Sequence, residues 1–331
     1  MKAHIKKISL ILAYLLVVGM LAGCGQTGSI DIVSPEDAMS PTTEDEIIEL
    51  ALEMVPLTAA PPTSITSPTA SGTSTSKNTK AEIDYSNTKD GYVMARFLQS
   101  TTKQLRVIVK GPTETQYTYT LKTNGEFEVY PLSDGNGSYT VTVYEQIEGT
   151  KYSTANSVSF TVTLNDEFAP FLRPNQYVNY KPDSKTVAKA AELIKNTNDL
   201  PSKISAIYNY VISNLTYDKE LAATVKSGYL PDVDAVLAKG KGICFDYAAV
   251  MASMLRSQGI PTKLVVGYAG QAYHAWIDVY SAETGWINSA IFFDGKAWKL
   301  MDPTFASTAN QSATVMQYIG DGSNYTTKYL Y

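Results

Sequence analysis

Hydrophobic and polar side chains alternate along residues 81–165. Apolar residues recur at every second position in short runs, for example at Leu105, Val107 and Val109, and turn residues such as Asn124-Gly125 separate the runs. A period of two places alternate side chains on opposite faces of a strand. About seven such strands with regular turns are typical of a two-sheet sandwich. We therefore expect this region to form an immunoglobulin-like β-sandwich.

A helical period replaces this alternation in the second half of the chain. Apolar residues recur three and four positions apart behind Ser184, which suits a helix cap, and again behind Pro201. A third helix is predicted over 244–258, because Gly259 follows it. Strands are predicted over 263–268, 273–280, 286–293 and 296–302, with an Asp294-Gly295 turn between the last two. Helices followed by an antiparallel sheet predict an α+β domain over 166–331.

The N-terminal residues 1–23 have the pattern of a secretory signal. Three lysines precede an apolar run over 8–20, which is shorter than the roughly 20 residues that span a bilayer. The run ends in Leu21-Ala22-Gly23-Cys24, which resembles the lipobox of bacterial lipoproteins. This resemblance implies that Cys24 is lipidated. A plain signal or anchor helix with an incidental cysteine is the alternative.

These patterns predict an exported protein whose mature chain begins at Cys24. A lipid on Cys24 would anchor it to the outer face of the bacterial cytoplasmic membrane, or to the periplasmic side in a two-membrane cell. Residues 25–53 are polar and acidic, and residues 55–80 are rich in Ser, Thr, Pro and Ala. Such segments bury too little apolar area to offset chain entropy. We therefore expect residues 24–80 to be a lipidated cysteine followed by a disordered tether.

Composition and charge exclude several functions. The 331 residues include 27 Lys+Arg and 32 Asp+Glu, a net charge of -5, whereas nucleic-acid binding requires a dense basic surface. Two cysteines and two histidines fall short of a disulfide scaffold or a multi-ligand zinc site, and the sequence contains no EF-hand loop. We expect no metal and no cofactor. Once the signal is removed and Cys24 is lipidated, Cys244 is the only free thiol and His274 the only histidine.

Cys244 lies where a glycine-containing loop, Lys241-Gly242-Ile243, opens into a predicted helix. Unpaired backbone N–H groups and the positive end of the helix dipole favour a thiolate at this position. The same N–H groups can stabilise an oxyanion. The alternative is a buried cysteine that acts as a small hydrophobe.

Two further residues suit a thiol enzyme. The alternation of the 273–280 strand places His274 on the same face as Trp276. Asp302 ends the next predicted hairpin, and a carboxylate there can accept the imidazole N–H and fix its tautomer. A structural histidine and a turn aspartate before Pro303 are the respective alternatives.

The order Cys, His, Asp on a helix start, a strand and a strand end is that of papain-like thiol enzymes. The motifs are KGICFDYAAVMASMLRSQGIPTKLVVGY, YHAWIDVY and WKLMDPTF. Together they make roughly residues 200–305 similar to the bacterial transglutaminase-like superfamily. The resemblance implies a papain/transglutaminase-like fold in which Cys244 is the nucleophile, His274 the base and later the acid, and Asp302 its orienter. The Cys244 N–H is then one oxyanion donor, and Tyr217 is a candidate for the second.

Three functions remain open. The resemblance implies a cell-surface enzyme that cleaves peptide or side-chain amides through a thioester, as a hydrolase or as an acyltransferase to amines. Its partner would be a protein or peptide substrate, such as one of the cell envelope. A non-catalytic interaction module on the same fold is the first alternative. A structural surface protein in which the β-domain does the work is the second.

Overall fold

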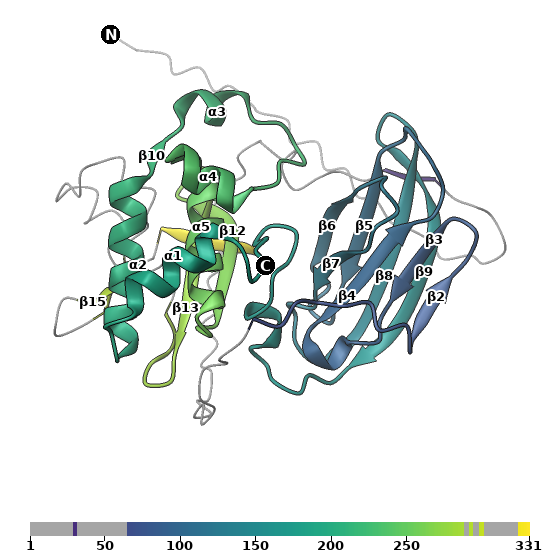
Figure 1. Ribbon diagram of the computed structural model, residues 1–331. Helices are drawn as coiled ribbons and strands as arrows, with labels where there is room; N and C mark the ends of the chain where they lie inside the picture. Colours follow the sequence, from purple (N-terminus) through teal and green to yellow (C-terminus); the bar gives the residue numbers. More distant parts are fainter. Residues whose placement is uncertain (1–28, 32–64, 288–290, 294–297, 301–323) are drawn as a thin grey trace, which may run out of the picture.

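The structure is a computed structural model that describes residues 29–31, 65–287, 291–293, 298–300 and 324–331. A β-rich part comes first along the chain, and an α+β part follows it (Figure 1). The expected order of an all-β region ahead of an α+β domain is therefore confirmed. Cys24 and Asp302 lie outside the described residues.

The β-rich part consists of two antiparallel sheets. The first has the order β1-β9-β8-β5-β6 and the second the order β2-β3-β4-β7. The strands are β1 (Ser29–Asp31), β2 (Thr75–Lys77), β3 (Ala81–Asp84), β4 (Tyr92–Phe97), β5 (Leu105–Lys110), β6 (Gln116–Leu121), β7 (Glu128–Pro131), β8 (Gly137–Glu148) and β9 (Lys151–Val162), with a short 3-10 helix, η2 (Thr88–Asp90), before β4.

Alternate residues of these strands form the core of the sandwich. Val107 on β5 and Val141 on β8 are fully buried, and Val93 and Ala95 on β4 of the other sheet are buried in the same cluster. The period-two pattern thus predicted the strands β5, β6 and β8 and the faces they bury. The immunoglobulin-like topology remains a prediction.

The expected tether is shorter than the sequence suggested. Residues 75–77 form β2, which pairs with β3 at the edge of the second sheet. The Gly72 N–H donates to the Asp84 carboxylate at 2.7 Å, and the Asn78 amide donates to the Ala155 carbonyl at 2.7 Å. The prediction of disorder up to residue 80 is therefore wrong for residues 65–80. Composition misled here because these residues are ordered by hydrogen bonds to the sandwich rather than by apolar burial.

A second part of the predicted tether also pairs with the sandwich. Strand β1 lies antiparallel to β9, with Ser29 opposite Ser153 and Asp31 opposite Lys151. Residues 25–53 are polar and acidic overall, and this composition concealed the short strand at Ser29–Asp31.

The α+β part begins with a short 3-10 helix, η3 (Ala169–Phe171). Its helices are α1 (Lys185–Ile194), α2 (Leu200–Asn214), α3 (Lys219–Thr224), α4 (Val233–Lys239) and α5 (Cys244–Ser257), and its strands are β10 (Thr216–Tyr217), β11 (Lys241–Gly242), β12 (Thr262–Ala269), β13 (Ala272–Ser281), β14 (Gly285–Ile287), β15 (Ile291–Phe293), β16 (Trp298–Leu300) and β17 (Tyr325–Leu330). The three predicted helices are present as α1, α2 and α5. Within the described residues, no helix is both long enough and apolar enough to cross a membrane.

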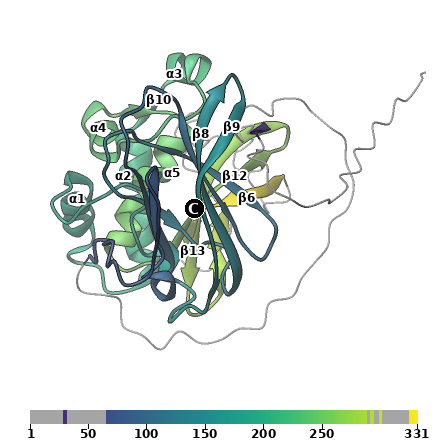
Figure 2. The ribbon, with the colours of Figure 1, turned by 90° about the vertical axis from the view of Figure 1, so that its right-hand side faces the viewer.

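Strands β14-β13-β12-β17 form an antiparallel sheet in that order. Helix α5 packs against β12 and β13 on one side and against α1, α2 and α4 on the other, an arrangement visible in both views (Figures 1 and 2). The predicted strands over 263–268 and 273–280 are confirmed as β12 and β13. The predicted 286–293 strand appears as β14 and β15, and β15 pairs antiparallel with β16. The Asp294-Gly295 turn lies outside the described residues.

An aromatic cluster joins the two parts of the molecule. Tyr177, from the segment between them, packs against Tyr119 of β6 at a ring-centroid distance of 5.6 Å and against Tyr331 at 4.5 Å. Its ring also lies 5.2 Å from that of Phe245, the residue after Cys244. Because Tyr119, Tyr177 and Tyr331 are all buried, the sandwich and the α+β part share one core.

A second contact fastens the connecting segment to the sheet. The ring of Phe168 lies 4.3 Å from that of Tyr280 on β13, and Phe171 meets Trp286 on β14 at 5.4 Å. The Lys263 ammonium lies 3.8 Å from the Trp286 ring centroid, within the range of a cation–π interaction. The segment that connects the two parts therefore packs against the sandwich through Tyr177 and against the α+β sheet through Phe168 and Phe171.

We predict that Tyr177→Ala lowers the free energy of unfolding by about 3–5 kcal/mol, the usual cost of truncating a large buried ring. Wild type should unfold in one transition, at the same midpoint by tryptophan fluorescence and by far-UV circular dichroism. The fluorescence reports only the α+β part, because every tryptophan lies after residue 275. Tyr144→Ala, on a half-buried tyrosine of β8 outside this cluster, should cost about 1 kcal/mol. Two well-separated wild-type transitions would contradict a shared core.

Candidate thiol site

Helix α5 presents Cys244 at its first position. The preceding residue, Ile243, is extended (φ -95°, ψ 177°) and serves as the N-cap. Residues 246–256 are all buried, whereas Cys244 itself is half-buried and its thiol is free. The nucleophile predicted from the sequence thus lies at a partly exposed end of α5, where backbone N–H groups have no partner within the helix.

A buried carboxylate fixes the start of this helix. Asp246 accepts the Ile243 N–H at 2.9 Å and the Tyr229 hydroxyl at 2.7 Å. A Cβ atom at Gly242 would lie 2.6 Å from the Asp246 Cβ, which is closer than real side chains approach. Glycine at position 242 therefore allows the loop to pack directly on Asp246.

Tyr217 lies beside the loop that leads to Cys244. Strand β10 runs parallel to β11, with Tyr217 opposite Gly242, and the Asp218 N–H donates to the Gly242 carbonyl at 2.8 Å. The structure thus brings the segment of the candidate oxyanion residue next to the cysteine loop. Its role as a donor remains a prediction.

Asp218 secures this strand pair. Its carboxylate caps α3 by accepting the Leu221 N–H at 3.0 Å, and it pairs with Lys239 at 2.9 Å and Lys241 at 3.1 Å. The Leu221 N–H, and next the Lys239 ammonium, hold the pKa of Asp218 well below its usual range. A charged group therefore links α3 to the loop before Cys244.

His274 lies on β13, the strand that packs against α5. Its side chain is buried, and its ring lies 6.3 Å from the Trp276 ring and nearly parallel to it, with an interplanar angle of 22°. Gly267 of β12 is opposite His274. A Cβ at Gly267 would lie 2.8 Å from the Trp276 ring and 2.0 Å from the Thr326 carbonyl oxygen. The absence of a side chain at position 267 thus makes room for the ring beside His274.

The structure therefore places two of the predicted catalytic residues on elements that pack together. Cys244 starts α5 and His274 lies on β13. Strand β16 ends at Leu300, two positions before Asp302. The roles of all three residues remain predictions.

Sequence reasoning assigned no role to three residues that shape this site, Asp246, Tyr229 and Gly267, and it placed Gly242 only in the loop before Cys244. A signal was present for Asp246, because an acidic residue at the third position of a helix often bonds back to the N-cap N–H. None was available for Tyr229, whose contact joins residues 17 positions apart. In the described part of the chain, no three His, Cys, Asp or Glu side chains gather as a metal site would require.

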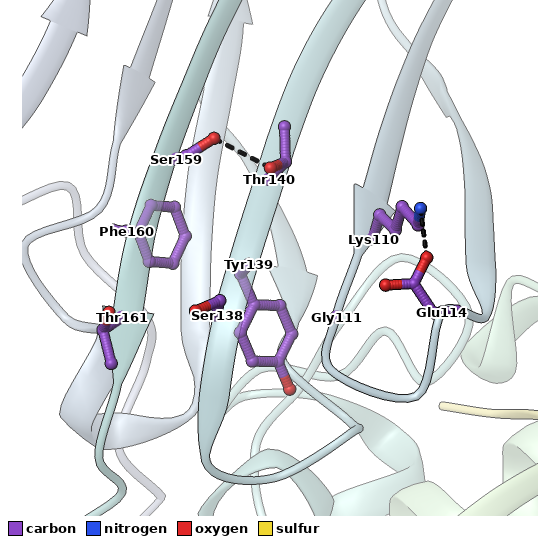
Figure 3. Close-up of a pocket in the computed structure, with 9 residues that line it drawn as sticks. All are labelled: Lys110, Gly111, Glu114, Ser138, Tyr139, Thr140, Ser159, Phe160 and Thr161. Carbon is purple, nitrogen blue, oxygen red and sulfur yellow. Dashed lines mark hydrogen bonds and ion pairs between the residues drawn. The ribbon is translucent and has the colours of Figure 1, made fainter. Parts of the chain in front are cut away.

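A separate hollow lies on the β-sandwich (Figure 3). It is lined by β5, β8 and β9 and the turn after β5, and includes no residue of α5 or β13. Two of its hydroxyls, on Thr140 and Ser159, bond to one another at 2.8 Å, and Lys110 pairs with Glu114. Because all of its lining residues belong to the sandwich, the hollow adds no group to the thiol site.

Comparison with known proteins finds a family match within the α+β part. Residues 187–290 match the family model of the transglutaminase-like superfamily. This stretch includes both Cys244 and His274, so the chain carries a transglutaminase-like domain, as its motifs predicted.

Two curated proteins are similar to parts of the chain. The uncharacterized protein YebA of Bacillus subtilis is 28% identical over 197 residues, which cover 50% of this chain and 26% of that protein. A protein-glutamine gamma-glutamyltransferase of Pseudomonas aeruginosa is 34% identical over 61 residues, which cover 14% of this chain and 9% of that protein. The matches thus span about a quarter of the first relative and about a tenth of the second.

Solved structures give weaker likenesses. A TGase has a TM-score of 0.29 at 21% identity, covering 51% of this chain and 45% of its own. Red sea bream transglutaminase has a TM-score of 0.29 at 15% identity, covering 69% of this chain and 53% of its own. The family assignment therefore rests on the match over residues 187–290.

We predict that Asp218→Asn flattens the acid dependence of unfolding. Because the folded pKa lies below the unfolded value of about 3.9, the ionised carboxylate stabilises the folded state above about pH 4. This contribution is lost as the pH falls through the folded pKa. Asparagine still caps α3 but cannot pair with the two lysines. Urea unfolding at about pH 6 and pH 3 measures the difference.

The matched control is Asp199→Asn. Asp199 caps α2 by accepting the Ser202 N–H at 2.8 Å, and its pKa is lowered chiefly by that bond. The Asp199→Asn variant should flatten the acid dependence of the free energy of unfolding less than Asp218→Asn does. Equal acid losses in wild type and Asp218→Asn would show that the ion pairs contribute nothing.

Proposed function

We propose that this protein is a thiol enzyme that cleaves amide bonds of peptides or glutamine side chains through a thioester. The observation that carries the proposal is the match of residues 187–290 to the transglutaminase-like superfamily, within which the free thiol of Cys244 starts the buried helix α5 and His274 lies on the strand packed against it. This position favours a thiolate because helix N-termini stabilise negative charge.

The first half of the reaction forms the acyl-enzyme. The Cys244 thiolate attacks the amide carbonyl, and a C–S bond forms as the carbonyl π electrons move to oxygen. The oxyanion is held by the Cys244 N–H and by a donor on the Tyr217 segment. Collapse breaks the C–N bond, and the departing amine takes a proton from His274. Asp302 holds the imidazole in the tautomer that the reaction requires.

The second half releases the product. An amine or water attacks the thioester, gives its proton to His274 and takes the acyl group as the C–S bond breaks. The similarity to a protein-glutamine gamma-glutamyltransferase favours a glutamine side chain as donor and an amine as acceptor. Water competes wherever the site does not exclude it, so hydrolysis is the second outcome to be measured.

We further propose that the enzyme is exported and lipid-anchored through Cys24, and that it acts on a protein or peptide of the cell envelope. The N-terminal lysines, apolar run and lipobox-like Leu21-Ala22-Gly23-Cys24 support this location. The net charge of -5 argues against a nucleic-acid partner.

The proposed reaction is tested with a glutamine-containing peptide, with and without a fluorescent primary amine. Wild type should release ammonia and incorporate the amine. Cys244→Ser should lose about 10³-fold or more of the activity, because a nucleophile is rarely replaced without such losses. The matched control is Cys24→Ser, which removes the chain's other cysteine and should retain turnover.

The outcomes separate the alternatives. Ammonia release without amine incorporation would identify a hydrolase and contradict cross-linking. Equal rates in wild type and Cys244→Ser would contradict thiol catalysis and leave an interaction module on this fold.

The proposed location is tested by labelling cells with radioactive palmitate. Wild type should carry the label and begin at Cys24, whereas Cys24→Ser should lose the label and retain residues 1–23, because the lipid bond requires the thiol. Cys244→Ser is the control and should keep the label. A mature N-terminus at another residue would contradict lipidation at Cys24.

A further inference from the structure

We infer that Asp246 is a positioning residue for the proposed nucleophile: its carboxylate bridges the backbone N–H of Ile243 and the hydroxyl of Tyr229, and so sets the turn that orients Cys244. This inference rests on the proposed function of Cys244.

The first argument is that both oxygens of the carboxylate are used. One accepts the Ile243 N–H at 2.9 Å, in the residue immediately before Cys244, and the other accepts the Tyr229 hydroxyl at 2.7 Å. Asp246 has no exposed surface. Two bonds to opposite oxygens define the plane of the carboxylate as well as its position, which a single capping bond cannot do.

The second argument is the close packing on the loop side. Gly242 leaves no room for a side chain, because a Cβ there would meet Asp246 at 2.6 Å. Gly242 is also held from its other side by the pairing of β11 with β10. The residues before Cys244 are therefore confined between β10 and Asp246.

The third argument is that Tyr229 comes from another element. It lies in the segment between α3 and α4, so its bond to Asp246 ties that segment to the first turn of α5. Burial raises the pKa of Asp246, and the two donors oppose this by stabilising the carboxylate.

The chemistry indicates a geometric role rather than an electrostatic one. A negative charge close to Cys244 disfavours the thiolate, so the carboxylate's charge gives no advantage to the nucleophile. Asparagine in the same place can accept the Ile243 N–H through its oxygen and donate to the Tyr229 oxygen through its nitrogen. We therefore expect the Asp246→Asn variant to retain the orientation of Cys244.

The experiment compares Asp246→Ala, Asp246→Asn and Tyr229→Phe in the full chain. Two quantities are measured: the alkylation rate of Cys244 by iodoacetamide across pH 5–9, located by mass spectrometry, and kcat and KM for a glutamine peptide. Asp246→Ala should lower kcat by about 10²-fold, the usual cost of a misplacement of about 1 Å, with KM nearly unchanged. Asp246→Asn should stay within about threefold of wild type, and Tyr229→Phe should lose about tenfold, the loss of one buried hydrogen bond.

The matched control is Asp234→Ala. Asp234 lies on α4 and accepts the N–H groups of Lys185 and Thr186 at 3.0 and 2.9 Å, so it holds the start of α1 rather than α5. Its loss should lower stability but leave the alkylation profile and kcat close to wild type. A fall equal to that of Asp246→Ala would assign the effect to general destabilisation and overturn the inference.

Other results would also decide whether Asp246 positions Cys244. Wild-type rates in a folded Asp246→Ala, or losses in Asp246→Asn as large as those in Asp246→Ala, would overturn the geometric role. If Asp246→Ala does not fold, Asp246→Asn and Tyr229→Phe give the answer, because each keeps the Ile243 bond. Failure of the proposed function looks different: wild-type Cys244 would then alkylate only near the ordinary thiol pKa of about 8.5, and His274→Ala would change nothing.

Discussion

The rest of the structure depends on the burial of α5 on all sides. Residues 246–256 are buried without interruption, and a helix apolar around its whole circumference is stable only inside a core. The polar groups at its two ends are satisfied within the protein. Arg256 donates to the carbonyls of Thr262, Arg173 and Tyr331, and Asp246 accepts the Ile243 N–H at the other end. Both ends are thereby fixed, and only the terminal residues of the helix, Cys244, Phe245 and Ser257, are partly exposed.

This constraint makes the β-sandwich part of the site's support. Helices α1, α2 and α4 pack on one side of α5 and strands β12 and β13 on the other. Phe245, next to the thiol, packs on Tyr177, which in turn packs on Tyr119 of the sandwich. Through Tyr177, the sandwich thus supports the first turn of the helix that begins at Cys244.

The sequence predicted the elements that have a long, regular pattern. The sandwich strands, α5 with Cys244 at its start, and β13 with His274 all follow from periodicity and stop signals. The two-residue strands β10 and β11 have no measurable period, and β17 is polar enough to pass for a loop. The bond between Asp246 and Tyr229 is tertiary, so no local pattern contains it. The prediction of disorder for residues 65–80 was wrong, because amino-acid composition does not reveal backbone pairing with a neighbouring strand.

The pairing of β1 with β9 changes the geometry expected for the proposed lipid anchor. Only five residue steps separate Cys24 from Ser29, where β1 begins, and they reach at most about 18 Å. A lipid on Cys24 would then hold the β1 edge of the sandwich close to the membrane surface rather than at the end of a long stalk. The substrates within reach would be those that lie close to the bilayer.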